Sequence, residues 1–280
     1  MWYIASYPKS GNTWVRIFII ELLNLISTNP KTIKLNSDIC TGEIVSSRMW
    51  VDDQLGITSS DLDEKELFNI RYKLGSTPYT YSDKYSFHKV HDSFVSHTSH
   101  KSPIVSLKNC KGIIYIIRNP IDIVISLSHY YSWDYEKSIE FMINSQSSLC
   151  SRQDKSFTQV KQHLGRWDEH VLSWTSKKIT PLIIIRYEDL INFPYKNFSK
   201  ISEFLYITNN KELINSAIEK TSFENLKQKE IDEGGFVENS SKKGKFFRSG
   251  KVGEGYKKLN KDQLNKLNFE FGKTLQKWDY

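Results

Sequence analysis

A lysine, a glycine and several small polar residues lie close together near the start of the chain, in the stretch SYPKSGNTWVR from Ser6 to Arg16. Residues 2–6 before the loop predict a short β-strand, and apolar residues at helical spacing predict a helix from Thr13 to Ile26. A helix that follows a tight loop presents unpaired backbone N–H groups and a partial positive charge. The stretch is therefore suited to binding a phosphate or a similar anion.

The order of residues in this loop differs from that of the usual mononucleotide loop. In the pattern G-x-x-x-x-G-K-[ST] the lysine follows the glycines onto the helix, whereas Lys9 precedes Gly11 here. Lys9 can supply a full charge, and the residues that can surround the anion are Ser10, Gly11, Asn12 and Thr13. An ordinary strand-to-helix turn with a surface lysine is the alternative interpretation.

Two further polar clusters follow predicted strands. Residues 86–91 alternate as a strand does and end with Lys89 and His91, and the continuous apolar run Ile113–Ile117 ends at Arg118. Because ligands bind at the carboxyl ends of parallel strands, we expect these clusters and the Lys9 loop to converge on one edge of the sheet. A histidine at a strand end is more often structural, but its imidazole could also act as a general base.

The remaining predicted elements indicate an α/β fold with a central parallel sheet flanked by helices. Helices are predicted over residues 61–72, capped by Ser60, over residues 120–131 and over residues 157–176, and a strand over residues 181–186. Strands separated by helices are typical of a parallel sheet. We expect residues 1–280 to form a single domain.

Composition limits the class of protein. The chain has 280 residues, of which 39% are hydrophobic and 13% aromatic, enough to bury a sizeable core. The best apolar run, Ile17–Ile26, is interrupted by Glu21 and Asn24, and the N-terminus lacks the pattern of a signal peptide. We therefore expect a cytoplasmic protein without a membrane partner. The cysteines, which are Cys40, Cys110 and Cys150, are scattered and indicate no zinc site.

The formal net charge of +7 suggests an anionic ligand or partner. Basic residues crowd one C-terminal stretch, namely Lys242, Lys243, Lys245, Arg248, Lys251, Lys257, Lys258 and Lys261. A solvated lysine-rich surface is the alternative explanation for this stretch.

Three motifs, in chain order, resemble those of the cytosolic-type sulfotransferases, which move a sulfuryl group from 3′-phosphoadenosine-5′-phosphosulfate (PAPS) to an alcohol, phenol or amine. SYPKSGNTW is similar to their 5′-phosphosulfate loop, YIIRNPIDIVISLSHYY to their 3′-phosphate motif and FFRSGKVGEGYK to their C-terminal phosphate loop. The resemblance covers nearly the whole chain. It implies a sulfotransferase fold like that of the P-loop nucleotide kinases, a PAPS-dependent transferase activity, the product 3′-phosphoadenosine-5′-phosphate (PAP) and no metal.

The resemblance also implies catalytic roles. Lys9 would stabilise the leaving phosphate, and His91 would be the general base of an in-line displacement. Lys89 would lie beside the transferring sulfuryl oxygens. Ser126 would bind the 3′-phosphate and hold Lys9 until the acceptor arrives.

The nucleotide is expected to contact a larger set of residues. Trp14 and Phe223 match the pair that stacks on adenine, and Tyr187 matches the contact to the adenine edge. The residues expected to bind PAPS are Lys9, Ser10, Gly11, Asn12, Thr13, Trp14, Arg118, Ser126, Tyr187, Thr221, Ser222, Phe223, Phe247, Arg248, Ser249 and Gly250.

The chain departs from the family pattern in its last motif. Arg248-Ser249-Gly250 stands where the family usually has Arg-Lys-Gly, and Gly253-Glu254-Gly255-Tyr256 stands where it often has Gly-Asp-Trp. The family's common dimerisation motif has no match, so a monomer and a homodimer both stay open. The effect of these departures on cofactor affinity is open as well.

The acceptor is not specified by the motifs. We expect a small molecule, as in bacterial sulfotransferases that modify natural products, and no nucleic acid. Its pocket is expected in the loops 38–82, 93–101 and 145–156, and O- and N-sulfation both stay open. A P-loop nucleotide kinase is one alternative, but it predicts a GK[ST] loop. A non-catalytic polyanion-binding module is another, but it leaves the order of Lys9, His91 and Arg118 unexplained.

Overall fold

The structure is a computed structural model, and the part of the chain that it describes comprises residues 1–36, 43–74, 86–94, 103–105, 107–108, 110–151, 157–176, 181–239 and 244–280. The chain divides into two compact units, which are described separately. The sheet unit consists of Met1–Pro8, Glu43–Tyr115 and Glu140–Ile184. The helix unit consists of Lys9–Gly42, Ile116–Ile139 and Ile185–Tyr280.

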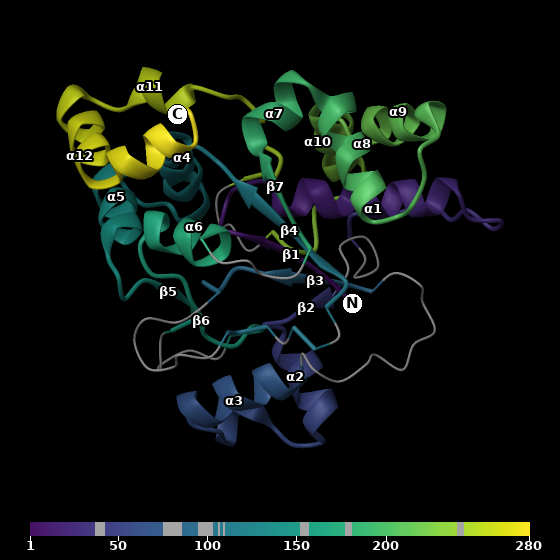
Figure 1. Cartoon of the computed structure of the whole chain (residues 1–280), viewed down its shortest axis with the longest axis horizontal. Coiled ribbons are helices and arrows are strands. Elements are labelled where there is room, and N and C mark those ends of the chain that lie inside the picture. Colours follow the sequence, from purple (N-terminus) through teal and green to yellow (C-terminus); the bar gives the residue numbers. More distant parts are fainter. Residues whose placement is uncertain are drawn as a thin grey trace. The chain divides into compact units, whose positions relative to one another are not determined.

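A five-stranded sheet with the order β2-β3-β1-β4-β7 is the main feature of the sheet unit (Figure 1). The strands are β1 Trp2–Ser6, β2 Glu43–Ile44, β3 Phe87–Val90, β4 Gly112–Ile117 and β7 Leu182–Arg186. β1 and β2 both pair with β3 in parallel, with Ile4 and Ile44 each opposite Lys89. Every residue of β1 and β4 is buried, as expected for apolar strands covered on both faces. The predicted strands and their parallel arrangement are thus confirmed.

Smaller elements complete the sheet unit. They are α2 Arg48–Leu55, the 3₁₀ turn η2 Ser59–Asp61, α3 Glu64–Leu74, β5 Ser148–Leu149, β6 Gln162–His163 and α6 Trp167–Thr175; α5 Tyr135–Ile143 begins in the other unit. The predicted start of the helix at residue 61 is wrong, and so is its cap. Asp63 and Glu66 form the reciprocal cap instead, with backbone-to-side-chain distances of 2.8 and 2.9 Å.

The helix predicted over residues 157–176 is confirmed only for α6. Residues 162 and 163 form β6, which pairs antiparallel with β5. Val160 and Leu164 are fully buried although they are not helical. Buried side chains at a spacing of four therefore imitated a helix in the sequence.

The helix unit contains the helices α1 Asn12–Leu25, α4 Pro120–Tyr131, α7 Tyr187–Asn192, α8 Pro194–Phe204, α9 Lys211–Lys220, α10 Phe223–Asp232, α11 Glu254–Lys258 and α12 Lys261–Lys277. The helices predicted after Lys9 and Arg118 are confirmed by α1 and α4. Figure 1 shows α1 beside the green helices α8 to α10, and α9 packs against α1, α8 and α10. One core cluster of this unit consists of Ile17, Leu35, Leu226, Phe236 and Phe247.

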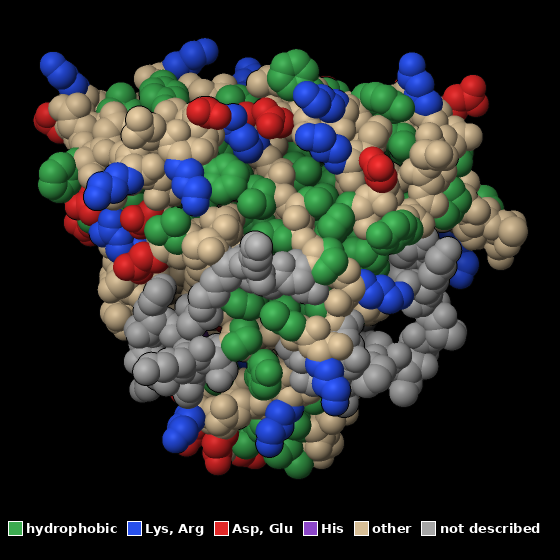
Figure 2. Space-filling view, viewed as in Figure 1, with side chains coloured by type: hydrophobic (Ala, Val, Ile, Leu, Met, Phe, Trp, Pro, Cys, Tyr) green, Lys and Arg blue, Asp and Glu red, His purple; other side chains and the backbone are tan. Residues whose placement is uncertain are grey.

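The surface carries charges of both signs. On the face shown in Figure 2, Lys and Arg side chains are interspersed with Asp and Glu side chains. On this face the positive side chains therefore do not lie apart from the negative ones. Among the described residues, the structure has no helix that is both long and apolar enough to span a membrane.

Candidate functional site

The loop between β1 and α1 has an unusual backbone. Lys9 and Gly11 have φ angles of 68° and 97°, and Gly11 is the N-cap of α1. A Cβ atom at Gly11 would lie 2.6 Å from a ring carbon of Tyr187. Only glycine combines this conformation with such a close approach to an aromatic ring. The loop therefore leads directly onto the positive N-terminal end of α1.

Two buried polar atoms beside this loop have no hydrogen-bond partner among the described residues. They are Oγ of Ser10, a residue that is 1% exposed, and Nε of Arg118. An unsatisfied buried polar group costs about 1–3 kcal/mol. Such atoms next to a helix N-terminus are suited to an anionic ligand with several acceptor oxygens.

Arg118 connects the three sequence motifs. Its Nη1 donates to the carbonyl of Lys9 at 2.9 Å, and its Nη2 lies 3.4 Å from the carbonyl of Lys251. The guanidinium carbon is 4.2 Å from the ring centroid of Tyr187. The predicted convergence of the Lys9 loop with the end of β4 is therefore confirmed.

The ammonium group of Lys9 lies against two aromatic rings that the sequence analysis did not single out. Nζ is 3.9 Å from the ring centroid of Tyr130 and 4.6 Å from that of Phe246. Both distances are in the range of cation–π contacts. Tyr130 lies one helical turn after Ser126 on α4, and Ser126 is half-buried. Helical spacing from Ser126 was the signal in the sequence that could have pointed to Tyr130.

The residues expected to bind adenine lie in the helix unit. Trp14 donates from Nε1 to the carbonyl of Thr221 at 2.7 Å. Trp14 and Phe223 both pack against the core cluster. Gly250 has a φ of 63°, and a Cβ atom there would lie 2.4 Å from the Phe223 ring. Ser222 caps α10, accepting from the backbone N–H of Asn225 at 3.3 Å.

The segment around Phe247 is held by the core cluster and by a carboxylate of α10. Phe247 is 5% exposed and belongs to the core cluster. The carboxylate of Glu230 accepts from the backbone N–H groups of Phe246 and Phe247 at 2.7 and 3.0 Å. The backbone that leads to Arg248 is therefore anchored to α10.

Arg248 is engaged by a carboxylate. Its Nη2 and Nη1 lie 2.7 and 3.3 Å from the two oxygens of Glu254. Lys258 approaches the same carboxylate at 3.0 Å. The hydrogen bond from Arg248 is the main reason why the pKa of Glu254 is lowered to about 2, and a hydrogen bond from Ser249 acts in the same direction.

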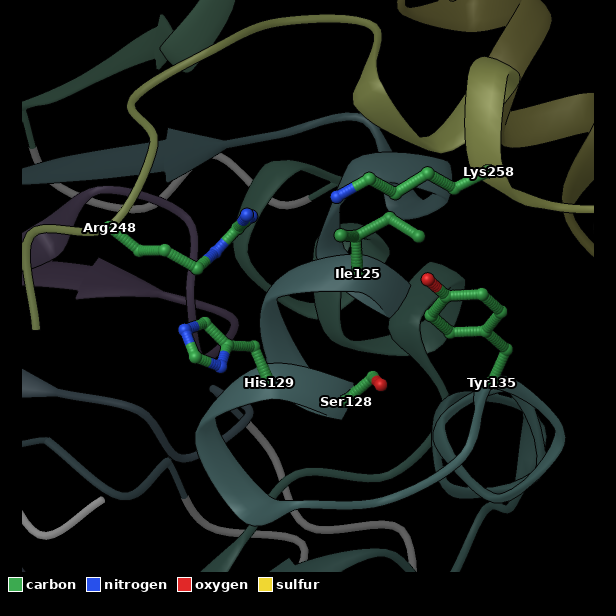
Figure 3. A pocket seen from close by; sticks show the side chains of 6 residues that line it. All are labelled: Ile125, Ser128, His129, Tyr135, Arg248 and Lys258. Atoms are coloured by element: carbon green, nitrogen blue, oxygen red, sulfur yellow. The ribbon is translucent and has the colours of Figure 1, made fainter. Parts of the chain in front are cut away.

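A pocket of about 280 Å³ lies beside Arg248, lined by Ile125, Ser128, His129, Tyr135, Arg248 and Lys258. Figure 3 shows Arg248 extending from its loop toward α4, with His129 below it in this view. Burial lowers the pKa of His129, and the positive charge of Arg248 lowers it further. The pocket is thus lined by apolar and polar side chains together, and two of them, Arg248 and Lys258, are cationic.

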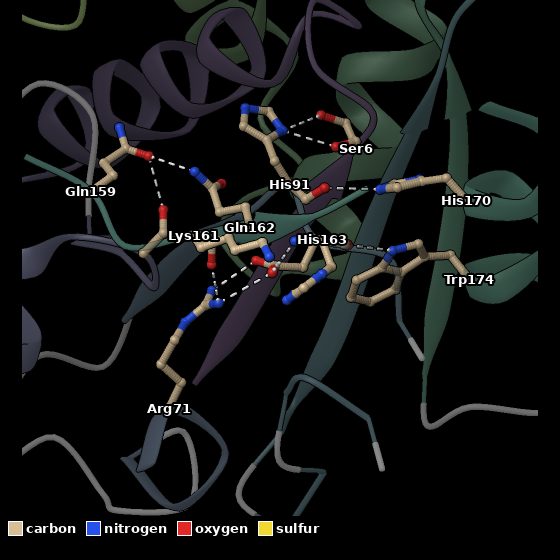
Figure 4. A network of polar contacts seen from close by, with 11 residues as sticks. Ser6, Arg71, His91, Gln159, Lys161, Gln162, His163, His170 and Trp174 are labelled. Atoms are coloured by element: carbon tan, nitrogen blue, oxygen red, sulfur yellow. Dashed lines mark hydrogen bonds and ion pairs between the residues drawn. The ribbon is translucent and has the colours of Figure 1, made fainter. Parts of the chain in front are cut away.

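His91 lies in the sheet unit, directly after β3. Its Nδ1 is 2.8 Å from the carbonyl oxygen of Ser6, at the end of β1 (Figure 4). Because a carbonyl oxygen only accepts hydrogen bonds, Nδ1 carries the proton in this contact and Nε2 carries the lone pair in the neutral ring. Lys89 lies two residues earlier on β3. The ends of β1 and β3 are therefore adjacent, as predicted.

The backbone of His91 is held by a second histidine. Nε2 of His170 donates to the carbonyl of His91 at 3.0 Å (Figure 4). Nδ1 of His170 therefore accepts from the hydroxyl of Tyr115, also at 3.0 Å. Burial lowers the pKa of His170 to about 4, so the ring is neutral at pH 7. Its two hydrogen bonds require one tautomer.

Asp92, the next residue, is at the centre of a buried polar network. Its carboxylate pairs with Arg71 at 2.7 and 3.1 Å, and both side chains are 2% exposed. The same carboxylate accepts from the backbone N–H of His163 at 3.0 Å, and Trp174 donates to the Asp92 carbonyl at 3.1 Å. The sequence analysis did not identify this network, whose members are far apart along the chain.

All the residues expected to bind PAPS lie in the helix unit, and Lys89 and His91 lie in the sheet unit. The loops expected to form the acceptor pocket include residues 38–42, 75–82, 95–101 and 152–156, which lie outside the described residues. Within the described ranges, no three His, Cys, Asp or Glu side chains are grouped as metal ligands would be.

Comparison with known proteins identifies similar sequences over nearly the whole chain. Residues 2–279 match the family model described as "Sulfotransferase domain". Sulfotransferase 1B1 of the dog is 28% identical over 225 residues, which are 80% of this chain but only 65% of the dog protein. Cytosolic sulfotransferase 5 of Arabidopsis thaliana is 24% identical over 293 aligned positions, and the alignment covers 98% of this chain and 79% of the plant protein.

Solved structures share the fold. The structure of mouse sulfotransferase SULT7A1 complexed with PAP has a TM-score of 0.60 and 22% identity, covering 98% of this chain and 84% of the mouse chain. The structure of retinol dehydratase in complex with retinol and PAP has a TM-score of 0.62 and 17% identity, covering 98% and 80% of the two chains. The predicted fold is therefore confirmed.

Proposed function

The chain belongs to the sulfotransferase domain family, and on that premise we propose that it transfers a sulfuryl group from PAPS to a hydroxyl or amine of a small-molecule acceptor. The observation that carries this proposal is the anion site at the start of α1. There, the buried Ser10 Oγ and Arg118 Nε have no partner among the described residues and lie next to the N-terminus of the helix. Both atoms can donate a hydrogen bond, and both therefore suit the oxygens of a phosphate or sulfate.

The residues present fit PAPS in charge and in shape. The Lys9 loop and the first turn of α1 would hold the 5′-phosphosulfate, and Arg118, Ser126 and Arg248 would hold the 3′-phosphate. Gly11 and Gly250 let the backbone approach the Tyr187 and Phe223 rings closely, because a Cβ atom at either position would lie 2.6 or 2.4 Å from the ring. Trp14, Phe223 and Tyr187 would contact the adenine. When bound, PAPS supplies the sulfuryl group and leaves as PAP.

Lys9 would stabilise the negative charge that develops on the leaving phosphate. The Tyr130 and Phe246 rings, 3.9 and 4.6 Å from Nζ, favour the charged ammonium and restrict where it lies. Fixed charges of this kind act in the transition state without reorganisation. In our proposal Lys9, Arg118 and Arg248 provide this positive charge without a metal.

His91 would remove the proton from the acceptor. The Nδ1–H group donates to the Ser6 carbonyl at 2.8 Å, which leaves Nε2 as the basic nitrogen. General base catalysis typically contributes about 10²–10⁴-fold to the rate. The contacts of His170, Trp174 and Arg71 with residues 91 and 92 keep this part of the backbone in place.

We further propose that residues 1–280 act as one sulfotransferase domain in the cytoplasm, the compartment for which the Arabidopsis relatives are named. A non-catalytic polyanion-binding module is not favoured. It leaves unexplained why Lys9, His91 and Arg118 each follow a strand of the sheet.

Calorimetry with two nucleotides tests the proposal. PAP should bind at least about tenfold more tightly than adenosine 5′-phosphate, because only PAP carries the 3′-phosphate that Arg118 and Arg248 would contact. Radiolabelled PAPS with panels of phenols, alcohols and amines should then identify an acceptor. Equal affinity for the two nucleotides would show that the site does not recognise a 3′-phosphate.

A further inference from the structure

Arg248 has two potential anionic partners, one inside the protein and one in the ligand. We infer that the carboxylate of Glu254 competes with the 3′-phosphate of the nucleotide for Arg248 and thereby weakens PAP binding. This inference rests on the proposed function, because it assumes that Arg248 contacts a 3′-phosphate. It identifies Glu254 as a residue that tunes nucleotide affinity.

The geometry of the pair is the one that a phosphate would also use. Both terminal nitrogens of Arg248 face the two oxygens of Glu254, at 2.7 and 3.3 Å. Arginine binds carboxylates and phosphates with this same planar fork. The fork can therefore serve one of the two anions fully, or both only in part.

Glu254 is the fixed member of the pair. The buried carboxylate of Asp122 accepts from the backbone N–H groups of Gly253 and Gly255 at 2.7 and 2.8 Å, one on each side of Glu254. A Cβ atom at Gly255 would lie 2.3 Å from the carbonyl oxygen of Ile121, so the segment contacts the backbone of α4 directly. A shift of the Glu254 backbone away from Arg248 would break these contacts, so the point from which its side chain starts is fixed.

Arg248 is the more mobile member, since its side chain is long and 31% exposed, against 18% for Glu254. In Figure 3 it reaches toward α4 from a loop rather than from a helix or strand. An ion pair with this exposure is partly screened by water, so another anion can replace it. A nucleotide phosphate would then gain Arg248 only by separating it from Glu254.

The carboxylate stays charged during this competition. The pKa of Glu254 is lowered to about 2, mainly by Arg248, and Lys258 also pairs with it at 3.0 Å. Glu254 is therefore an anion at any pH where the protein would function. Besides engaging Arg248, its charge would repel a nearby phosphate.

The test compares nucleotide binding by the full-length chain and its variants in calorimetry. Glu254→Gln should bind PAP about three- to tenfold more tightly than the wild type, whereas the affinity for adenosine 5′-phosphate should change less than about twofold. Glu21→Gln is the matched control. It removes the same charge from an ion pair of the helix unit, with Lys220 at 3.0 Å, that includes none of the proposed nucleotide contacts.

A second pair of variants shows whether Arg248 carries the effect. The gain in PAP affinity from Glu254→Gln should be lost when Arg248→Gln is also present, because the guanidinium group that would bind the phosphate is then missing. If Glu254→Gln does not fold, Glu254→Asp tests the same idea, because the shorter side chain reaches Arg248 less well and should also bind PAP more tightly.

Each outcome has a clear meaning. Unchanged or weaker PAP binding by Glu254→Gln would overturn the inference. The carboxylate would then have no effect on PAP affinity, or it would orient Arg248 for the ligand. A gain that persists without Arg248 would also overturn it. If the wild type does not prefer PAP to adenosine 5′-phosphate, the proposed function itself fails, and this result is distinguishable from the other two.

Discussion

Individual side chains at the end of β3 are held by contacts on several sides. His91 donates from Nδ1 to Ser6, and its own carbonyl accepts from the neutral His170. The next residue, Asp92, pairs with Arg71 in the interior. Removing one partner of a buried ion pair is costly, and the Asp92 carboxylate also accepts from the His163 backbone, so the pair holds the backbone next to His91 in place.

Substitution of His91 separates catalysis from nucleotide binding. His91→Asn should lower kcat by at least about 100-fold, because the base is lost, while PAP affinity should stay within about twofold of the wild type. The turnover is measured with PAPS and an identified acceptor, and the affinity by calorimetry. Near-normal turnover at neutral pH would assign His91 a structural role and require another base.

At the scale of elements, the loop that joins β1 to α1 is shaped by close packing around Gly11. Its φ of 97° and the nearby Tyr187 ring both exclude a larger residue. Arg118, at the end of β4, binds the same loop through the Lys9 carbonyl. The proposed anion site thus depends on one strand end, one loop and one helix N-terminus, and the strand end and the loop are joined by a hydrogen bond of 2.9 Å.

Two glycine substitutions separate backbone strain from packing. Gly11→Ala should destabilise the fold by about 2–4 kcal/mol and lower PAP affinity more than tenfold, because strain and a collision with Tyr187 add. Gly234→Ala has a similar φ of 74° but open space around it, so it should cost only about 1 kcal/mol and leave PAP affinity unchanged. Urea unfolding and calorimetry check both values. Equal losses in the two variants would argue against a packing requirement at Gly11.

At the scale of the whole molecule, the sequence was sufficient for the strands β1, β4 and β7 and for the helices α1 and α4. Continuous apolar runs followed by Pro, Gly or charged residues define these elements locally. The start of the helix predicted over residues 157–176 was wrong, because Val160 and Leu164 are buried without being helical. The periodic pattern of apolar residues there comes from the burial of these side chains and not from a helix.

The partners of the site residues could not be predicted in the same way. The pair of Arg71 with Asp92 and the contact of Lys9 with Phe246 join residues that are distant along the chain. Nothing in their local spacing indicates these contacts, which depend on tertiary packing. The motifs located Arg248, but only the structure shows that Glu254 engages it.

Two buried histidines of the sheet unit should make the stability of the protein depend on pH. His88 and His170 are 1% and 0% exposed, and burial lowers the pKa of each to about 4. In the unfolded chain each ring takes up a proton near pH 6.5. Between about pH 6.5 and pH 4 the unfolded state therefore binds more protons, and the folded state loses stability as the pH falls.

The expected loss is at most about 3 kcal/mol for each histidine, and urea unfolding at pH values from 7.5 to 4.5 measures it. His170→Gln provides the comparison, because an amide can still donate to the His91 carbonyl but does not titrate. The variant should show a clearly weaker dependence on pH than the wild type across this range. Glu254 does not confuse the result, because its stabilising charge is lost only between its ordinary pKa of 4.5 and its lowered value of about 2. An unfolding free energy that stays constant down to pH 4.5 would mean that the buried histidines gain protons in the folded state as easily as in the unfolded chain.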